Sequence, residues 1–367
     1  MLVVLSGGGT AGHINPALAL AEVLEERGCE VRFAGTPEGV EARLAREAGI
    51  PFKAFEVSGF DRKHPTTGLK ALNLLRKSTP LAVSWFNEIK PDVVVAFGGY
   101  VCVPVSRAAE KMGIPLVVHE QNSVMGIANK NLAKNAARIC LTYEAAASDL
   151  SDTSNVVVTG NPVRKSIFDA TREQGRAYLG IPDDALMLLV FGGSQGARHI
   201  NQGIVALKDK LLSYPDLYIV HVTGPKELES VESALSLSPE EAKRWMLFGY
   251  QNQMGACMAA ADAIIARAGA TSLAEISARA IPALLIPFPR ATADHQTMNA
   301  RSYVEAGCAL MMPDDQVETD AFEQNVCRLI EDADLRAHMT ACAKQQKTVD
   351  AARLLADEVM AVAQNRA

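Results

Sequence analysis

The stretches LVVLSGGGTAGH at residues 2–13 and LMLLVFGGSQGA at residues 186–197 decide the fold. In each of them, an apolar strand runs into a glycine-rich turn, and a helix begins directly after the turn. Glycines let the backbone approach a ligand closely, and the first turn of a helix presents N–H groups that bind anions. One such turn is a weak signal. Two of them, half a chain apart, predict a protein with two similar lobes that hold phosphates on both sides of a cleft.

Length and composition favour two α/β domains. A chain of 367 residues is long enough for two domains of about 150 residues, each with its own core. Apolar runs such as PDVVVAF at 91–97 and PALLIPF at 282–288 alternate with helical stretches, which is typical of buried parallel strands. Seven cysteines without a CxxC pair indicate reduced packing residues in a cytosolic protein, and neither a disulfide framework nor a zinc site.

Charge and hydropathy exclude several classes of protein. The net charge of −6 argues against general nucleic-acid binding. The N-terminal apolar run is short and has no basic lead, so it predicts a strand and not a signal peptide. No apolar run approaches the ~18 residues that are needed to span a bilayer.

The pattern of apolar runs predicts the elements of both halves. Strands are expected at 2–6, 29–34, 92–97, 115–118 and 156–159 in the first half, and at 186–191, 217–222 and 283–286 in the second. Helices are expected at 13–27, 38–48, 104–112, 198–212 and 321–331, and the stretch from about 334 to 367 is alanine-rich and helical. An irregular, basic segment is expected after the helix at 38–48. The domain boundary is expected near Gly160-Asn161-Pro162, because proline cannot continue a strand ladder.

The first glycine turn fits the pattern G-x-G-x-x-G, but it does not predict a dinucleotide cofactor. That interpretation needs a carboxylate about 20 residues on, at the end of the second strand, where this chain reads RFAGT at 32–36. His13 directly follows the turn, at the start of a helix whose dipole favours a neutral imidazole that can accept a proton. A neutral base beside a phosphate site suits deprotonation of a sugar hydroxyl. A capping or packing histidine is the alternative.

The second half contains donors for a diphosphate and a carboxylate for a ribose. Ser194 lies in its glycine turn, and RAGATSLAE at 267–275 is a further glycine-to-helix entry that Thr271 or Ser272 can cap. Glu275 lies one turn inside this helix, where its carboxylate could accept hydrogen bonds from both hydroxyls of a ribose. A carboxylate that only stabilises the helix N-terminus is the alternative.

A metal site is poorly supported by the sequence. The D-x-D motif at 332–334 lies far along the chain between two helices, whereas magnesium at a diphosphate needs carboxylates beside the phosphates. We therefore expect helix N-termini and a cationic side chain, Arg164 above all, to stabilise a departing diphosphate. A polar loop that ends in DHQTMN at 294–299 begins at the carboxyl end of a strand, where open α/β sheets bind ligands.

Together these motifs become specific. The segments GGGTAGHINPALALA, FGGYVCVP, HEQNSVMGIANK, TGNPVR, FGGSQGA, RAGATSLAEI and DHQTMNA occur in the order seen in the MurG family, so nearly the whole chain resembles that family. Its members are glycosyltransferases that add N-acetylglucosamine to undecaprenyl-pyrophosphoryl-N-acetylmuramyl-pentapeptide in peptidoglycan synthesis. The resemblance implies a GT-B architecture of two Rossmann-like domains with an interdomain cleft. The domains are expected at 1–163 and 164–340, and a C-terminal helix at 341–367 is expected to cross back to the first domain.

The resemblance also implies roles for individual residues. His13 matches the histidine proposed as general base, Glu275 matches the ribose-binding glutamate, and Asn122 matches a donor-contacting asparagine. Contacts to UDP-N-acetylglucosamine are implied for Thr10, Ala11, Gly12, Asn122, Arg164, Ser194, Gln251, Ala270, Thr271, Ser272, Leu273, Ala274, Glu275 and Gln296. The acceptor diphosphate is implied to lie against Gly9, Gly98, Gly99 and Tyr100. Neither a metal nor a cofactor is implied.

Three positions depart from the family pattern. Gln251 stands where many members have an apolar residue near the uracil, so contacts to the base are expected to differ. His295 precedes Gln296 where some members have a paired glutamine, which affects one contact to the sugar. Ala11 replaces a frequent glycine, and this change is mild if its φ is negative.

The implied reaction is an inverting displacement without a metal. His13 removes a proton from the muramyl 4-hydroxyl as that oxygen attacks the anomeric carbon of the donor, and UDP leaves. If the base is elsewhere, water bound by Asn122, or Glu120, is the next candidate. A UDP-sugar epimerase of the same fold and a lipid-binding protein without turnover are the rival interpretations.

A lipid-linked acceptor implies a peripheral protein at the cytoplasmic face of the plasma membrane, with cell-wall synthesis proteins as partners. Between Arg62 and Asn87 the chain has five basic residues and no acidic one. Leucines recur here at helical spacing with basic residues alongside and an aromatic residue downstream, which suits an anionic membrane surface. The expected dock consists of Leu69, Lys70, Leu72, Leu75, Arg76, Lys77 and Trp85. An amphipathic helix packed on the sheet is the alternative.

Overall fold

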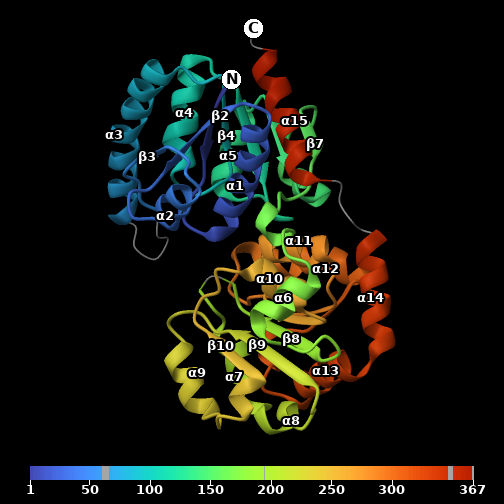
Figure 1. The fold of residues 1–367 in the computed structure, drawn as a ribbon. Helices are drawn as coiled ribbons and strands as arrows, with labels where there is room; N and C mark the ends of the chain where they lie inside the picture. The colour runs from blue at the N-terminus through green and yellow to red at the C-terminus, as the bar shows by residue number, and fades with distance from the viewer. Residues whose placement is uncertain (60–65, 194, 346–349, 366–367) are drawn as a thin grey trace. The chain divides into compact units, whose positions relative to one another are not determined.

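The computed structural model describes residues 1–59, 66–193, 195–345 and 350–365, which form two compact units (Figure 1). Unit 1 comprises Met1–Arg164 and Val349–Ala367, and unit 2 comprises Lys165–Thr348. Each unit is built around one parallel sheet with helices on both faces, which confirms the α/β fold that composition and patterning predict.

Unit 1 contains a seven-stranded sheet in the order β3-β2-β1-β4-β5-β6-β7. Its strands are β1 (Leu2–Ser6), β2 (Glu30–Gly35), β3 (Phe52–Ala54), β4 (Val93–Ala96), β5 (Leu116–Glu120), β6 (Arg138–Leu141) and β7 (Val156–Val158). The chain starts at β1 in the middle, proceeds outward to β3, and returns to the other side of β1 with β4. The loops after β1 and β4 therefore lie where the strand order reverses, and open α/β sheets bind ligands at such a position.

Helices cover both faces of this sheet because successive strand residues point to opposite sides. Val3 and Leu5 belong to a core with α1 (Ala11–Glu26), α2 (Val40–Glu47) and α15 (Ala351–Gln364). Val4 belongs to the core on the opposite face, with α3 (Thr66–Ile89), α4 (Cys102–Met112) and α5 (Ile127–Leu132).

The helix α15 completes the core of unit 1 although it lies at the C-terminal end of the chain. Leu355 and Val359 are fully buried beside residues of α1. Two ion pairs tie its surface to the unit, Arg27–Asp357 at 2.6 Å and Arg138–Glu358 at 2.8 Å. A single helix was expected over 341–367. Instead, α14 (Ala333–Gln345) ends in unit 2, and α15 begins in unit 1.

Unit 2 repeats the strand order of unit 1, with six strands in the order β10-β9-β8-β11-β12-β13. The strands are β8 (Leu186–Phe191), β9 (Leu217–Val222), β10 (Trp245–Phe248), β11 (Ala263–Ala266), β12 (Ala283–Leu285) and β13 (Ala309–Met311). The other helices of unit 2 are α6 (Arg172–Leu179), α7 (Arg198–Ala206), α8 (Lys208–Leu212), α9 (Leu228–Leu235), α10 (Met254–Ala260), α11 (Ala270–Arg279), α12 (His295–Glu305) and α13 (Asp320–Glu331). Here the strand order reverses between β8 and β11, so the second glycine turn and the segment RAGA at 267–270 lie at that position.

The single helix expected at 198–212 is two helices, α7 and α8. Leu207 separates them with φ −89° and ψ 10°, which departs from helical geometry. Only Leu207 separates the two helices, so the helical spacing of apolar residues continues from α7 into α8. The sequence pattern alone therefore does not reveal the break.

One buried histidine in each unit makes stability depend on pH. Burial lowers the pKa of His119 and of His221 to about 4, from an ordinary value of 6.5. The unfolded chain therefore binds more protons between pH 6.5 and 4, so stability is fully present above pH 6.5 and is lost as the pH falls. We expect the unfolding free energy of each unit to fall by about 1.4 kcal/mol per pH unit in this window, as urea denaturation at pH 7 and pH 5 would measure. A His221→Gln variant should lose that slope for unit 2, and an unchanged slope would contradict the assignment.

Candidate functional site

The two glycine turns of unit 1 interlock beyond the carboxyl ends of β1 and β4. The backbone N–H of Gly8 donates to the carbonyl oxygen of Gly98 at 3.2 Å. Gly99 has φ +86°, and a Cβ atom there would run into the carbonyl group of Gly8. Only glycine satisfies both the backbone conformation and the close approach at this position. The residues expected to bind the acceptor diphosphate, Gly9, Gly98, Gly99 and Tyr100, thus lie in two loops in direct contact, and their binding role stays a prediction.

His13 lies in the first turn of α1 with its ring held by the glycine turn. Its Nδ1 lies 2.8 Å from the carbonyl oxygen of Gly8. Because a carbonyl oxygen only accepts, Nδ1 carries the hydrogen and Nε2 of the neutral ring has a free lone pair. A Cβ atom on Gly98 would lie 3.2 Å from Nε2, so this edge of the ring lies against the loop that contains Gly98 and Gly99. The half-buried ring therefore presents a proton acceptor at the loops that the sequence assigns to phosphate.

The motif HEQN at 119–122 forms an internal network at the end of β5. Both carboxylate oxygens of Glu120 are used: Oε1 accepts from the backbone N–H and the side chain of Asn122, and Oε2 accepts from Gly126 N and Asn129 Nδ2, at 2.9–3.1 Å. Glu120 is also buried, so it is a poor alternative base. Its role in the structure is to fix Asn122 and Asn129.

Asn129 is a site residue that the sequence reasoning missed. Its Nδ2 donates to the carbonyl oxygen of His119 at 3.1 Å as well as to Glu120. A Cβ atom on Gly98 would lie 3.5 Å from this same nitrogen. Asn129 therefore connects the HEQN network to the glycine turn beside His13. It lies within the motif HEQNSVMGIANK, but neither its residue type nor its spacing indicated this role.

Arg164, expected to stabilise the departing diphosphate, is the last residue of unit 1. Its Nε lies 3.4 Å from Oε1 of Glu22 on α1, with both side chains about one-third exposed. A partly exposed pair at this distance contributes about 0–1 kcal/mol, so it restrains the guanidinium weakly. Thr10, Ala11 and Gly12 form the junction of the first turn with α1, and Thr10 is the N-cap residue without a side-chain capping bond.

The glycine turn that follows β8 in unit 2 is also closely packed. Gly196 has φ +79°, and a Cβ atom there would run into the carbonyl oxygen of Thr223 at the end of β9. Gly193 has φ +88° and open space around its Cβ position. Ser194, expected to contact the diphosphate, lies outside the described residues.

The helix α11 begins at Ala270, and its N-cap is Gly269 without a side-chain capping bond. This corrects the expectation that Thr271 or Ser272 caps the helix: both lie inside its first turn. A glycine N-cap has no side chain of its own to accept hydrogen bonds from the first N–H groups of the helix. Leu273 is buried, whereas Ala274 and Glu275 are half-buried in the second turn.

A buried ion pair supports the residues that follow β12. Arg267 lies 2.5 Å from Asp314, and its NH1 donates to the carbonyl oxygens of Ile286 and Pro287 at 3.1 Å. The next residue, Phe288, donates its backbone N–H to Oε1 of Gln296 at 2.9 Å. Oε1 of Gln296 is therefore the occupied acceptor, and the Nε2 group is the end of this amide that can donate to a sugar hydroxyl.

Gln251 is buried, and its side chain is directed toward neighbouring helices. Its Oε1 accepts from the backbone N–H of Gln253 at 2.9 Å and from the hydroxyl of Tyr178 on α6 at 3.4 Å. Its Nε2 has no partner among the described residues. The acceptor of the Gln251 amide is thus used within unit 2.

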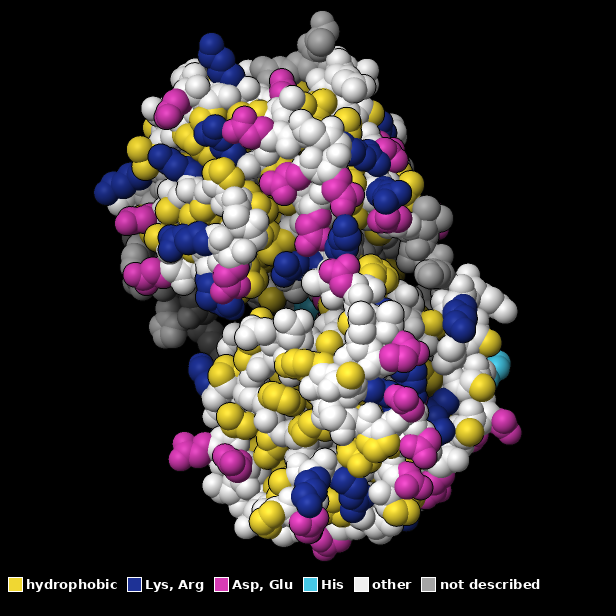
Figure 2. Space-filling model, viewed as in Figure 1, with side chains coloured by type: hydrophobic (Ala, Val, Ile, Leu, Met, Phe, Trp, Pro, Cys, Tyr) yellow, Lys and Arg dark blue, Asp and Glu magenta, His cyan; other side chains and the backbone are white. Residues whose placement is uncertain are grey.

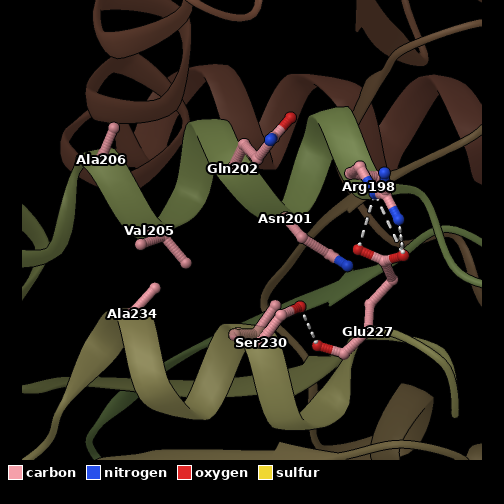
Figure 3. Close-up of a pocket in the computed structure, with 9 residues that line it drawn as sticks. Arg198, Asn201, Gln202, Val205, Ala206, Glu227, Ser230 and Ala234 are labelled. Atoms are coloured by element: carbon pink, nitrogen blue, oxygen red, sulfur yellow. Dashed lines mark hydrogen bonds and ion pairs between the residues drawn. The ribbon is translucent and has the colours of Figure 1, made fainter.

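A pocket of about 430 Å³ lies between α7 and α9, and Figure 3 shows the side chains that line it. Arg198 and Glu227 close one end with two-pronged hydrogen bonds of 2.8–3.1 Å. Val205 and Ala234 lie at the other end, and Asn201 and Ser230 lie between the two ends (Figure 3). None of the predicted site residues lines this pocket, and its charged pair is already satisfied, so we do not assign the donor to it.

The structure removes Trp85 from the expected membrane dock. Trp85 is 7% exposed and packs between Phe55 and Phe86 in the core under α3, so it cannot insert into a membrane. Along the same helix Arg76 and Lys77 are exposed and Leu75 is half-buried. The side chains of Leu69, Lys70 and Leu72 lie outside the described residues. No helix in the described part of the chain is long and apolar enough to cross a bilayer.

No group of three or more His, Cys, Asp or Glu side chains within the described ranges is arranged to hold a metal ion. Asp332, from the D-x-D motif, accepts the backbone N–H of Leu335 at 2.8 Å. This acidic motif therefore stabilises the start of α14, which is an ordinary role for an aspartate before a helix.

Comparison with known proteins identifies similar sequences and structures. The glycosyltransferase family 28 N-terminal domain matches residues 3–141, and the family 28 C-terminal domain matches residues 187–355. Two relatives named UDP-N-acetylglucosamine–N-acetylmuramyl-(pentapeptide) pyrophosphoryl-undecaprenol N-acetylglucosamine transferase are similar over nearly the whole chain. The protein from Acetivibrio thermocellus is 35% identical over 369 residues, covering 100% of both chains. The Bacillus subtilis protein is 36% identical over 357 residues, covering 97% of this chain and 98% of the relative. The crystal structure of MurG from Acinetobacter baumannii superposes with a TM-score of 0.74 at 28% identity, covering 98% of this chain and 99% of that one.

Proposed function

Because the chain belongs to glycosyltransferase family 28 and, within it, to the MurG family, we propose that it transfers N-acetylglucosamine from UDP-N-acetylglucosamine to the muramyl 4-hydroxyl of undecaprenyl-pyrophosphoryl-N-acetylmuramyl-pentapeptide. Its relatives of 35–36% identity carry this activity in their names. The observation that carries the proposal is a proton acceptor, Nε2 of His13, beside the two contacting glycine loops of unit 1.

In the proposed reaction, unit 1 binds the acceptor. The loops that contain Gly9 and Gly98–Tyr100 offer backbone N–H groups to its diphosphate, as glycine-rich turns and helix N-termini do. His13 Nε2 takes the proton of the 4-hydroxyl while that oxygen forms a bond to the anomeric carbon. The bond from this carbon to the UDP oxygen breaks at the same time, so the configuration at the anomeric carbon inverts.

Unit 2 binds the donor in this proposal. The N-terminus of α11 and the turn with Ser194 would stabilise the diphosphate, and Arg164 of unit 1 would contribute a positive charge. Glu275 would accept hydrogen bonds from the ribose hydroxyls, and the Nε2 group of Gln296 would donate to the sugar. Stabilisation of the leaving diphosphate is assigned to these groups and not to a metal ion.

The experiment that tests the proposal follows radiolabelled UDP-N-acetylglucosamine with and without the muramyl-pyrophosphoryl lipid. Label that moves to the lipid, only when the lipid is present, is the expected result. An epimerised nucleotide sugar without lipid would indicate a UDP-sugar epimerase of the same fold. Neither product, with lipid binding intact, would indicate a lipid-binding protein without turnover.

We also propose that the N-terminal half of α3 docks unit 1 to the cytoplasmic face of an anionic membrane, as a lipid-linked acceptor requires. The helix α3 connects the carboxyl end of β3 to the start of β4. Its N-terminal half, up to Arg76 and Lys77, therefore lies toward the carboxyl ends of the strands, where the glycine turns are. Figure 2 shows hydrophobic, basic and acidic side chains intermingled over this side of unit 1. Cell-wall synthesis proteins are the proposed partners at that surface.

Reversing both charges with Arg76→Glu/Lys77→Glu is expected to weaken binding to anionic vesicles at least about tenfold, because each basic residue near the surface contributes ~1 kcal/mol. Vesicle sedimentation at low and high salt measures this. The matched control is Lys90→Glu/Lys111→Glu, which makes the same charge change at exposed residues just before β4 and β5, on the opposite edge of the sheet. Vesicle binding that ignores both the α3 reversal and added salt would refute the dock.

A further inference from the structure

A buried carboxylate lies directly behind the first glycine turn of unit 1. Glu41, on α2, is 0% exposed. Its Oε1 accepts the backbone N–H of Thr36 at 3.0 Å and the hydroxyl of Thr36 at 2.5 Å. Thr36 directly follows β2, the strand end where the sequence itself contains no carboxylate. The acidic group at this strand end therefore comes from the following helix, which folds back over it.

Glycines from three segments surround the Glu41 side chain. A Cβ atom on Gly8 would lie 2.6 Å from Glu41 Oε1, and one on Gly35 would lie 2.5 Å from its Cγ. A Cβ atom on Gly39 would also collide with the carboxylate. Gly8 does not have a positive φ, so its backbone conformation does not require glycine. What requires glycine at position 8 is the space that Glu41 occupies.

The residue that Glu41 packs against is the one that orients His13. The carbonyl oxygen of Gly8 accepts the Nδ1 hydrogen of His13 at 2.8 Å, and the N–H of Gly8 donates to Gly98. Gly99 approaches the carbonyl group of Gly8 closely, and the Glu41 side chain occupies the space beside the Cα atom of Gly8. Both contacts restrict how far Gly8 can move.

The environment of Glu41 is not that of an ordinary structural carboxylate. Its second oxygen, Oε2, is buried and has no hydrogen-bond partner among the described residues. An unsatisfied buried acceptor costs stability, and such groups in folded proteins call for an explanation in function. A role of the Glu41 side chain in filling the space beside Gly8, next to His13, is such an explanation.

We propose that Glu41, held by Thr36, is a positioning residue for the transfer reaction. Its side chain fills the space beside Gly8 and so restricts the position of this residue. Through the Gly8 carbonyl, Glu41 keeps the hydrogen of His13 on Nδ1 and the lone pair on Nε2. The proposal rests on the function proposed above, and it assigns to Glu41 no contact with either substrate. It predicts that shape and hydrogen bonding at position 41 control the state of the His13 ring.

Three variants of the full chain test the proposal. Glu41→Ala removes the side chain that fills this space. Glu41→Gln keeps the size of the side chain and an Oε1 that accepts from Thr36. Glu38→Ala changes an exposed glutamate three residues away, before α2, and serves as the matched control. Each is measured for kcat and donor KM per folded enzyme, and for the protonated nitrogen of His13 by long-range ¹H–¹⁵N NMR with labelled histidine.

For Glu41→Ala we expect the Nδ1–H signature of His13 to be lost and kcat to fall by about 10- to 100-fold, because small misplacements of a catalytic group have effects of this size. The donor KM should change little, since most of the residues proposed to bind the donor belong to unit 2. Glu41→Gln and Glu38→Ala should keep both the Nδ1–H signature and most of kcat. The Gly8→Ala variant, which places a methyl group in the same space, should resemble Glu41→Ala in both measurements.

A Glu41→Ala protein with the wild-type His13 signature and wild-type kcat would overturn the proposal. So would loss of stability alone, with unchanged kcat per folded enzyme. If the wild-type chain transferred no sugar at all, the proposed function would fail. The NMR comparison would still report whether Glu41 controls the imidazole, so the two failures are distinguishable.

Discussion

Replacing His13 with alanine is expected to lower kcat for sugar transfer by about 10²–10⁴-fold and to leave the KM for UDP-N-acetylglucosamine unchanged. Nδ1 of His13 lies 2.8 Å from the carbonyl oxygen of Gly8 and donates its hydrogen to it. Nε2 is therefore the nitrogen that can accept the proton of the acceptor hydroxyl. Alanine removes this acceptor, whereas most of the residues proposed to hold the donor are in unit 2. Steady-state kinetics with varied donor at saturating acceptor measure both constants.

His338→Ala is the control for this experiment, because His338 is an exposed histidine on α14 of unit 2 and is not among the predicted site residues. Its kcat should stay within about twofold of wild type, as for most surface substitutions. If His13→Ala kept wild-type turnover, the base would lie elsewhere. Glu120 would be a poor replacement, since four donors already occupy its two carboxylate oxygens. Water held by Asn122 would then be the next group to test.

Gly99→Ala is expected to lower both the stability of unit 1 and the rate of transfer. Gly99 has φ +86°, where a non-glycine residue costs about 1–2 kcal/mol. Its Cβ atom would also run into the Gly8 carbonyl, and such overlaps cost about 1–3 kcal/mol more. Because this carbonyl orients His13, kcat should fall together with the unfolding free energy. Chemical denaturation and steady-state kinetics on the same preparation measure the two effects.

Gly9→Ala separates the two costs of the Gly99 substitution. Gly9 has φ +87°, almost the same backbone conformation, but no atom lies within 4 Å of its Cβ position. This variant should therefore lose only the backbone cost of about 1–2 kcal/mol. Equal losses of stability for the two variants would show that the close approach of Gly99 to Gly8 is unimportant.

Strand boundaries could be predicted where apolar runs are long. The predictions for β1, β8 and β9 agree with the structure to the residue. The short strands β3, β6, β10, β11 and β13 were not predicted, because three or four residues give only a weak pattern unless a clear apolar run contains them, as it does for β4 and β12. Much of the segment expected to be irregular forms α3, a helix of 24 residues with Pro80 in its interior; the helical spacing of its leucines indicated a helix only for part of this length. Proline normally ends a helix, so the pattern weakened there although tertiary packing maintains the helix.

The candidate site was less predictable than the fold, because several of its contacts depend on how distant segments fold back. Glu41 reaches the end of β2 only because α2 turns over that strand end. Trp85 follows a basic, leucine-rich stretch, but its helical phase places it in the core. The cap of α11 was assigned to hydroxyl side chains that favour such positions, whereas a glycine occupies it. The donor and acceptor roles of individual residues stay predictions.

The stereochemistry of the product tests the central claim, a one-step displacement, most directly. Donor labelled with ¹³C at the anomeric carbon is incubated with the enzyme, the muramyl-pyrophosphoryl lipid and a metal chelator, and the product is analysed by NMR. The account predicts a label joined to the muramyl 4-oxygen with inverted, β configuration, at a rate that the chelator does not change. Retained α configuration, or transfer that stops when metal is removed, would contradict it.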